Sequence, residues 1–195
     1  MNEARLKQAE RWFLTKYPGG FAHPELTAVG KKHRLEKMQA FVEESFAKKK
    51  FRDTDDLLVD WVKLVSRASL VSIFEKPKFR DLVSNLTPKE KNRFTAGLKA
   101  QLHGDQEKGF EQVLQILLRY KFAKWSIISL APVYANPQDE VFVKPTTAKG
   151  IISYLELDNL VYRPQPSWEF YTEFRHQIAR LRTRVDPSIA PNNPA

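Results

Sequence analysis

Residues 87–118 read TPKEKNRFTAGLKAQLHGDQEKGFEQVLQILL, and this stretch carries the clearest structural signals in the chain. Thr87 can cap a helix in a capping box with Glu90. Gly104 supplies a stop signal, and Asp105 opens a second segment whose apolar residues recur every three or four positions. The stretch therefore predicts two successive helices, 88–102 and 105–121.

Helical spacing of apolar residues extends outward from this pair through most of the chain. By the same criteria we expect further helices at 3–17, from Pro24 to about Lys49, from Asp53 to about Phe74, at 77–86, from Pro145 to about Leu157, and from Ser167 to about Val185.

The last third of the chain differs from the rest in its residue types. Residues 125–130 and 140–143 are rich in β-branched and aromatic side chains, and 135–139 supplies turn residues between them. We interpret these runs as a β-hairpin. The predicted fold class is therefore α+β and α-dominant, a multi-helix bundle with a small β-hairpin or short sheet in the C-terminal third.

The length of 195 residues fits one domain. We expect a single helical domain over 1–186, with a candidate sub-boundary near 75–87. Residues 187–195 are rich in proline and asparagine, and we expect them to form an extended tail outside the core.

Composition excludes several classes of protein. The chain has no cysteine, which excludes disulfide scaffolds, cysteine nucleophiles, zinc fingers and cysteine-ligated iron–sulfur clusters. No apolar run is long enough to span a bilayer, and the first residues lack the apolar segment of a signal peptide. We therefore expect a cytoplasmic protein without a membrane partner.

Motifs that mark common catalytic sites are missing from the sequence. We find no glycine-rich phosphate loop, no H-E-x-x-H and no G-x-S-x-G. Helix capping explains most of the acidic group Asp53, Asp55, Asp56 and Asp60, and the four histidines lie apart. The sequence therefore predicts no metal site, no cofactor and no recognisable catalytic residue.

Positive charge is concentrated in the N-terminal half. Residues 1–100 hold 21 Lys and Arg against 13 Asp and Glu, which gives +8 of the net +9. An asymmetry of this kind is one mark of a polyanion-binding face. The alternative is a solvated surface whose cations complement helix dipoles. The candidate polyanion-binding residues are Lys31, Lys32, Arg34, Lys37, Lys48, Lys49, Lys50 and Arg52.

Two smaller constellations occur in the C-terminal half. The first is a candidate anion pocket at a helix start, where ordinary capping is the alternative. The second is a candidate aromatic groove for a base or a proline-rich peptide, with a rigid connector packed on the core as the alternative. The pocket residues are Lys144, Thr146 and Thr147, and the groove residues are Tyr162, Arg163, Trp168 and Tyr171.

The same region carries a resemblance. The run from Lys124-Trp125 through F-x-K-P-T at Phe142–Thr146 to Y-x-P-x-P-x-W-x-x-Y at Tyr162–Tyr171 resembles the signature of a bacterial protein family without an established activity. The resemblance covers about 50 of the 195 residues. It implies a bacterial source and transfers no site residues.

Three functions are compatible with these observations. The first is a non-enzymatic interaction or regulatory protein, acting on an unknown protein partner or by self-association. The second is a sequence-independent nucleic-acid-binding protein that makes phosphate contacts with its basic half. The third is an enzyme whose site is assembled from scattered residues. Because no catalytic motif is present, we favour the first.

Overall fold

The computed structural model describes residues 1–193, and the secondary structure in that range is entirely helical. The α-helices are α1 (Glu3–Lys16), α2 (Pro24–His33), α3 (Leu35–Ser45), α4 (Thr54–Arg67), α5 (Glu75–Ser84), α6 (Pro88–His103), α7 (Gln106–Arg119), α8 (Trp125–Ile128), α9 (Leu130–Ala135), α10 (Pro145–Leu155) and α11 (Trp168–Arg182). The 3-10 helices are η1 (Gly20–Ala22), η2 (Lys48–Arg52) and η3 (Pro187–Ile189).

Helices α6 and α7 form the closest pair in the fold, and they match the two helices predicted from residues 87–118. The capping box is confirmed, because Thr87 and Glu90 bond to each other's backbone N–H. Asp105 caps α7 by accepting a hydrogen bond from the Lys108 backbone N–H at 3.0 Å. A Cβ added at Gly109 would lie 2.6 Å from the Gly97 carbonyl oxygen, so the two backbones approach closely.

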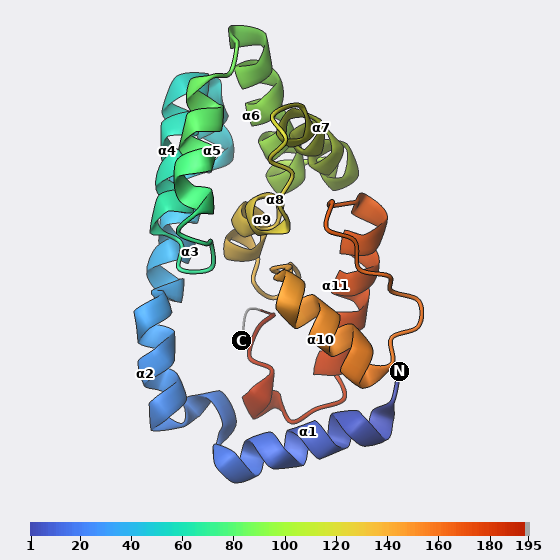
Figure 1. The fold of residues 1–195 in the computed structure, drawn as a ribbon. Coiled ribbons are helices and arrows are strands. Elements are labelled where there is room, and N and C mark those ends of the chain that lie inside the picture. The colour runs from blue at the N-terminus through green and yellow to red at the C-terminus, as the bar shows by residue number, and fades with distance from the viewer. Residues whose placement is uncertain (194–195) are drawn as a thin grey trace.

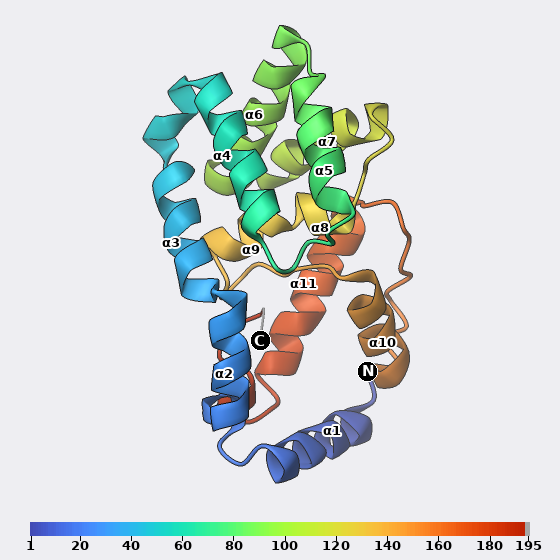
Figure 2. The same ribbon diagram turned by 60° about the vertical axis from the view of Figure 1, so that its left-hand side comes forward.

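Aromatic side chains fill the core between α4, α5 and α6. Trp61 of α4 stacks on Phe94 of α6 with ring centroids 4.2 Å apart, and Phe79 of α5 lies against both. All three are fully buried. Figure 2 shows α4, α5, α6 and α7 gathered at one end of the molecule, and these rings join three of them.

A second aromatic cluster joins α7 and α8 to α11. Phe110 lies 5.6 Å from Tyr171 and 6.4 Å from Trp125, measured between ring centroids. Trp125 in turn lies 5.1 Å from Phe170. This cluster holds the C-terminal helix against the central helices (Figure 1).

The predicted β-hairpin is wrong, and with it the α+β fold class. Residues 125–135 form α8 and α9, and no strand occurs anywhere in residues 1–193. The run is buried along nearly its whole length, and a short apolar run of this kind has no periodicity that separates a strand from a buried helix. Residues 140–143 lack regular secondary structure; their Val143 N–H donates to the Ser129 hydroxyl at 3.2 Å.

The long helix expected from Pro24 to about Lys49 is broken into two. Arg34 has φ 53° and ψ 36°, a left-handed conformation, and it separates α2 from α3. The second helix stops at Ser45, and a 3-10 turn follows. Nothing in the sequence marks this break, because arginine is a good helix former.

The N-terminal helix α1 lies along the far end of the molecule from α6 (Figure 1). Its start contacts the end of α10, where the Asn2 N–H donates to the Leu155 carbonyl at 2.7 Å. The turn η1 that follows α1 contacts η3 near the C-terminus. Gly20 makes this contact possible, because a Cβ added there would overlap Ser188 and its φ is +65°.

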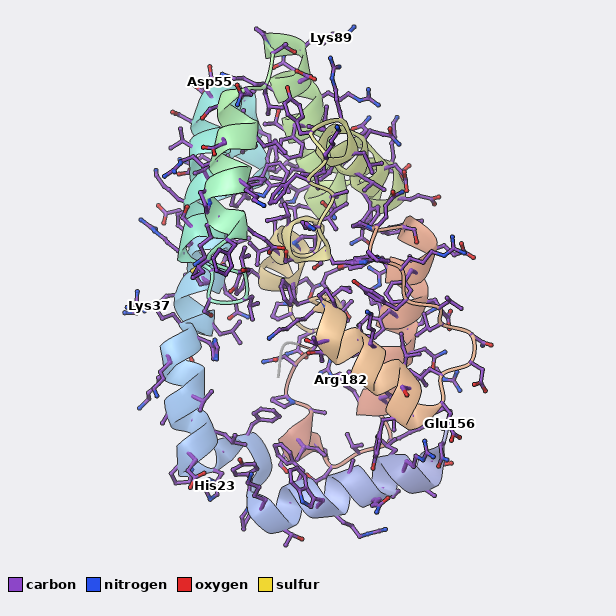
Figure 3. All side chains as sticks on the ribbon, viewed as in Figure 1. His23, Lys37, Asp55, Lys89, Glu156 and Arg182 are labelled. Atoms are coloured by element: carbon purple, nitrogen blue, oxygen red, sulfur yellow. The ribbon has the colours of Figure 1, made fainter. Side chains whose placement is uncertain are left out.

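The segment predicted as an extended tail folds back onto the body. Asn193 donates from its side chain to the Glu140 carbonyl at 2.9 Å, and its N–H donates to the Pro137 carbonyl. Arg182, which points inward in Figure 3, donates to Gln138 and to the Asn193 side chain. Residues 194–195 of the predicted tail lie outside the described residues.

Candidate polyanion interface

The structure places the first four candidate basic residues around the junction of α2 and α3. We call Lys31, Lys32, Arg34 and Lys37 the arm patch, and all four are exposed. The whole of α2 (Pro24–His33) contains no buried residue. Figure 3 shows Lys37 pointing away from the body of the protein. The patch is therefore open to solvent.

The other four candidates lie at the opposite end of α3. We call Lys48, Lys49, Lys50 and Arg52 the turn patch, and all are exposed on η2. The turn is anchored from within: Phe51 packs edge-on against the His103 ring at 5.6 Å, and His103 Nε2 lies 2.7 Å from the Phe46 carbonyl oxygen. This anchoring turns the four basic side chains outward.

None of these eight basic side chains forms an ion pair within residues 1–193. The ion pairs in that range use other cations, such as Lys91 with Asp55 and Arg175 with Glu140. A cation without a protein partner can neutralise a phosphate and release the counterions condensed on a nucleic-acid backbone. The eight side chains are therefore available to a polyanion.

The arm patch and the turn patch are separate surfaces. The exposed face of α3 between them carries Glu36, Glu43 and Glu44. The 11-residue helix α3 places the two patches about 16 Å apart at 1.5 Å per residue. An elongated polyanion can contact both patches, whereas a single phosphate group cannot.

Helical spacing places Lys99, which the sequence did not single out, on the face of α6 that contacts η2, so we group it with the turn patch. Helix α6 contacts η2 through the side that carries His103, and Asn92 on the same side accepts a hydrogen bond from Thr54. Lys99 shares that face by helical spacing and is exposed. The four-residue interval between Lys99 and His103 was the only signal in the sequence.

The candidate anion pocket lies at the first turn of α10. Lys144, Thr146 and Thr147 are all exposed there, and Lys144 is the N-cap residue without a capping side-chain bond. One turn on, the Lys149 ammonium lies 5.1 Å from the Tyr162 ring centroid. The structure thus brings the helix that carries the pocket residues beside the segment of the candidate aromatic groove.

The candidate aromatic groove is largely occupied by the protein's own core. Tyr171 is fully buried, so no base can stack on its ring. Trp168 packs on Phe110 at 5.5 Å, and Tyr162 packs edge-on against Phe170 at 5.9 Å. Arg163 is exposed, and its carbonyl accepts a hydrogen bond from Trp125. These contacts are those expected of a connector packed on the core.

The structure also reveals a buried carboxylate that the sequence analysis missed. Glu140 accepts hydrogen bonds from Gln106 at 2.7 Å, Arg175 at 2.8 Å and Tyr171 at 2.6 Å. It borders an open depression of about 250 Å³ next to Gln101 and other polar side chains. Its oxygens are fully engaged, so Glu140 ties the loop after α9 to α7 and α11.

The acidic group at the start of α4 is engaged in capping and ion pairing. Asp53 caps α4 through the Asp56 N–H, Asp55 pairs with Lys91, and Asp60 pairs with Lys63. No cluster of three or more histidine, aspartate or glutamate side chains suited to a metal ion occurs in the described part of the chain.

Buried tyrosines predict a loss of stability at alkaline pH. Burial raises the pKa of Tyr134 to about 12, and burial next to the Glu140 carboxylate raises the pKa of Tyr171 well above 10. In the unfolded chain both ionise near pH 10, so the folded state binds more protons above that pH and stability falls as pH rises. We expect the free energy of unfolding to drop by about 1.4 kcal/mol per pH unit for each tyrosine.

Urea unfolding followed between pH 8 and about 11.5 checks this alkaline loss. The Tyr134→Phe variant should leave the free energy of unfolding near pH 8 almost unchanged. Above pH 10 it should reduce the slope of that free energy against pH by the equivalent of about one proton. An unchanged slope in that variant would contradict the assignment to Tyr134.

Comparison with protein-family models, curated proteins and solved structures gives no match to this chain. The bacterial signature noted above therefore stays a resemblance. No helix within residues 1–193 combines the length and the apolar character needed to cross a membrane.

Proposed function

We propose that this chain is a non-enzymatic binding protein whose ligand is a polyanion, the phosphate backbone of a nucleic acid. The observation that carries the proposal is the set of eight exposed basic side chains at the two ends of α3, none of them ion-paired within residues 1–193. Paired surface cations add little to binding, whereas unpaired ones release counterions from a phosphate backbone.

The arrangement favours contact with phosphates over reading of bases. Seven of the nine basic residues in the two patches, Lys99 included, are lysines, which act as point charges on flexible stems. Most of them lie near the two ends of α3, and the exposed face of α3 between them carries three glutamates, so α3 itself does not suit a nucleic-acid groove. Phosphate contacts of this kind position a duplex without selecting a sequence.

Fluorescence anisotropy with labelled duplex DNA, single-stranded DNA and RNA tests the proposal. Between about 50 and 200 mM salt we expect affinity to fall about 10³-fold or more, which corresponds to six to ten phosphate contacts. The affinity should depend little on sequence at constant length. Absence of binding at 50 mM salt would overturn the proposal.

Three triple variants of equal charge locate the interface. The first variant removes most of the arm patch by changing Lys31, Lys32 and Lys37 to alanine. The second removes most of the turn patch by changing Lys48, Lys49 and Lys50 to alanine. The control changes three exposed cations elsewhere, Lys108, Lys124 and Arg180, to alanine. We expect each patch variant to reduce the salt slope by about three, since each lysine accounts for about one. Equal losses in the control would mean that net charge alone is responsible.

A further inference from the structure

The N-terminal arm, residues 1–33, is joined to the rest of the protein through the exposed helix α2, whose last residue, His33, has its ring Nδ1 2.8 Å from the Ser69 hydroxyl. Helix α2 has no buried residue, and its principal contact is with η1 inside the same arm. A ten-residue helix is marginal in water without tertiary packing. Figure 2 shows α2 extending away from the upper helices toward α1. Helix α1 and η1 are therefore linked along the chain to the body of the protein only through the exposed connector helix α2.

The connector ends in a single strained residue. Arg34 is left-handed, whereas the residues before and after it are helical. L-residues other than asparagine and aspartate rarely adopt this conformation, because Cβ crowds the backbone. If Arg34 became right-handed, residues 24–45 would form one continuous helix, and the arm would swing away from the body.

The contacts that hold α1 against the body are mostly polar and exposed. Leu6 is the one residue of α1 that is buried. Arg5 pairs with Glu156 at 3.0 Å, Lys7 donates to the Arg184 carbonyl, and Glu10 accepts from the Asp186 N–H. Such contacts are released at low cost in water, and a second copy of the chain offers the same groups.

We propose that residues 1–33 exchange between two copies of this chain, which gives a domain-swapped dimer. Arg34 straightens in each copy, and each α1 packs on the end of α10 and on η3 of the other copy. The contacts of α1 and η1 are regained across the dimer and the strain at two hinges is relieved, whereas the contact between His33 and Ser69 beside each hinge is given up. This inference does not depend on the polyanion proposal.

Because the chain has no cysteine, cross-linking gives a direct test. The side chains of Asn2 and Glu156 are hydrogen-bonded at 3.0 Å and exposed, so Asn2→Cys with Glu156→Cys places two thiols at the docking contact. A short bis-maleimide joins them within one chain in the closed form and between two chains in the swapped form. Denaturing gels then separate monomers from covalent dimers, and Asn2→Cys alone controls for random collisions.

Two variants at the hinge carry the same change of charge and opposite expectations. Arg34→Gly relieves the left-handed strain and weakens the continuous helix, so it favours the closed monomer. Arg34→Ala favours the continuous helix. In the two-cysteine background we expect the dimerisation constant to be at least about tenfold larger for Arg34→Ala than for Arg34→Gly. Light scattering measures the same ratio without cross-linking.

The cross-linking results distinguish arm exchange from a closed monomer and from dimers of another kind. Covalent dimers that increase with protein concentration, and increase further with Arg34→Ala, support the exchange. Cross-links confined to single chains at every concentration, in the Arg34→Ala variant as well, would overturn it. Dimers that form equally in the two hinge variants would also overturn it, since they would not involve Arg34.

Discussion

The Gly109→Ala variant is expected to lose about 3 kcal/mol or more of stability, because overpacking that meets backbone cannot relax. A Cβ at position 109 would lie 2.6 Å from the Gly97 carbonyl oxygen and 2.7 Å from the Ala100 carbonyl carbon, and closer still to the Gln101 nitrogen. These are backbone atoms of α6, so α6 and α7 must move apart to admit the methyl group. The loss is a large share of the stability of an ordinary domain.

Urea unfolding followed by circular dichroism measures the effect of Gly109→Ala. The matched control is Gly150→Ala, in the interior of α10, where an added Cβ meets no atom within 4 Å. That control should be neutral or stabilising by about 0.5–1 kcal/mol, because alanine is the better helix former. A Gly109→Ala protein as stable as the control would show that α6 and α7 do not approach as closely as described.

The Glu140→Ala variant should be destabilised by about 3 kcal/mol, because it leaves the Arg175 guanidinium without its counter-charge in a largely buried position. The Arg175 guanidinium pairs with Glu140 at 2.8 Å. The Tyr171 hydroxyl and the Gln106 amide would also lose their acceptor. These groups lie on α7 and α11, so the loss loosens both helices from the loop after α9.

The control for Glu140→Ala is Glu169→Ala, an exposed acid in the first turn of α11 that should change stability by no more than about 0.5 kcal/mol beyond its dipole contribution. Glu140→Gln keeps the size of the side chain and should fall between the two. Thermal unfolding ranks the three variants. If Glu140→Ala matched Glu169→Ala, the carboxylate would have no structural role.

The helices that the sequence predicted well are those with local start and stop signals. The capping box at Thr87 and Glu90, the stop at Gly104 and the caps at Asp105 and Ser167 all appear as expected. Each of these features is decided within one turn of helix, so it needs no information from distant residues. Positions that depend on distant packing were the ones predicted wrongly.

Residues 125–143 illustrate that limit. Their β-branched and aromatic content favoured strands, but a strand needs a partner, and none occurs in residues 1–193. The run 125–134 is buried among α3, α6 and α7, where a helix satisfies its own backbone hydrogen bonds. Burial by neighbouring helices overrode local propensity.

The candidate polyanion interface likewise has features that follow from the sequence and features that follow from packing. The positions of Lys31 to Lys37 and Lys48 to Arg52 on the surface follow from their charge alone. Their arrangement depends on how α3, α6 and η2 pack. This packing puts the two groups at opposite ends of α3, with Glu36, Glu43 and Glu44 between them, and brings Lys99 to the second patch. Sequence spacing cannot report contacts between residues fifty positions apart.

Most of the helices, the excess of positive charge in the first hundred residues and the exclusion of cysteine chemistry follow from composition and from signals within a few residues. The break at Arg34, the need for glycine at position 109 between two backbones and the burial of Glu140 with three partners become visible only in the folded protein. For Gly109 and Glu140 the determining atoms belong to other elements of the fold, and packing brings them together.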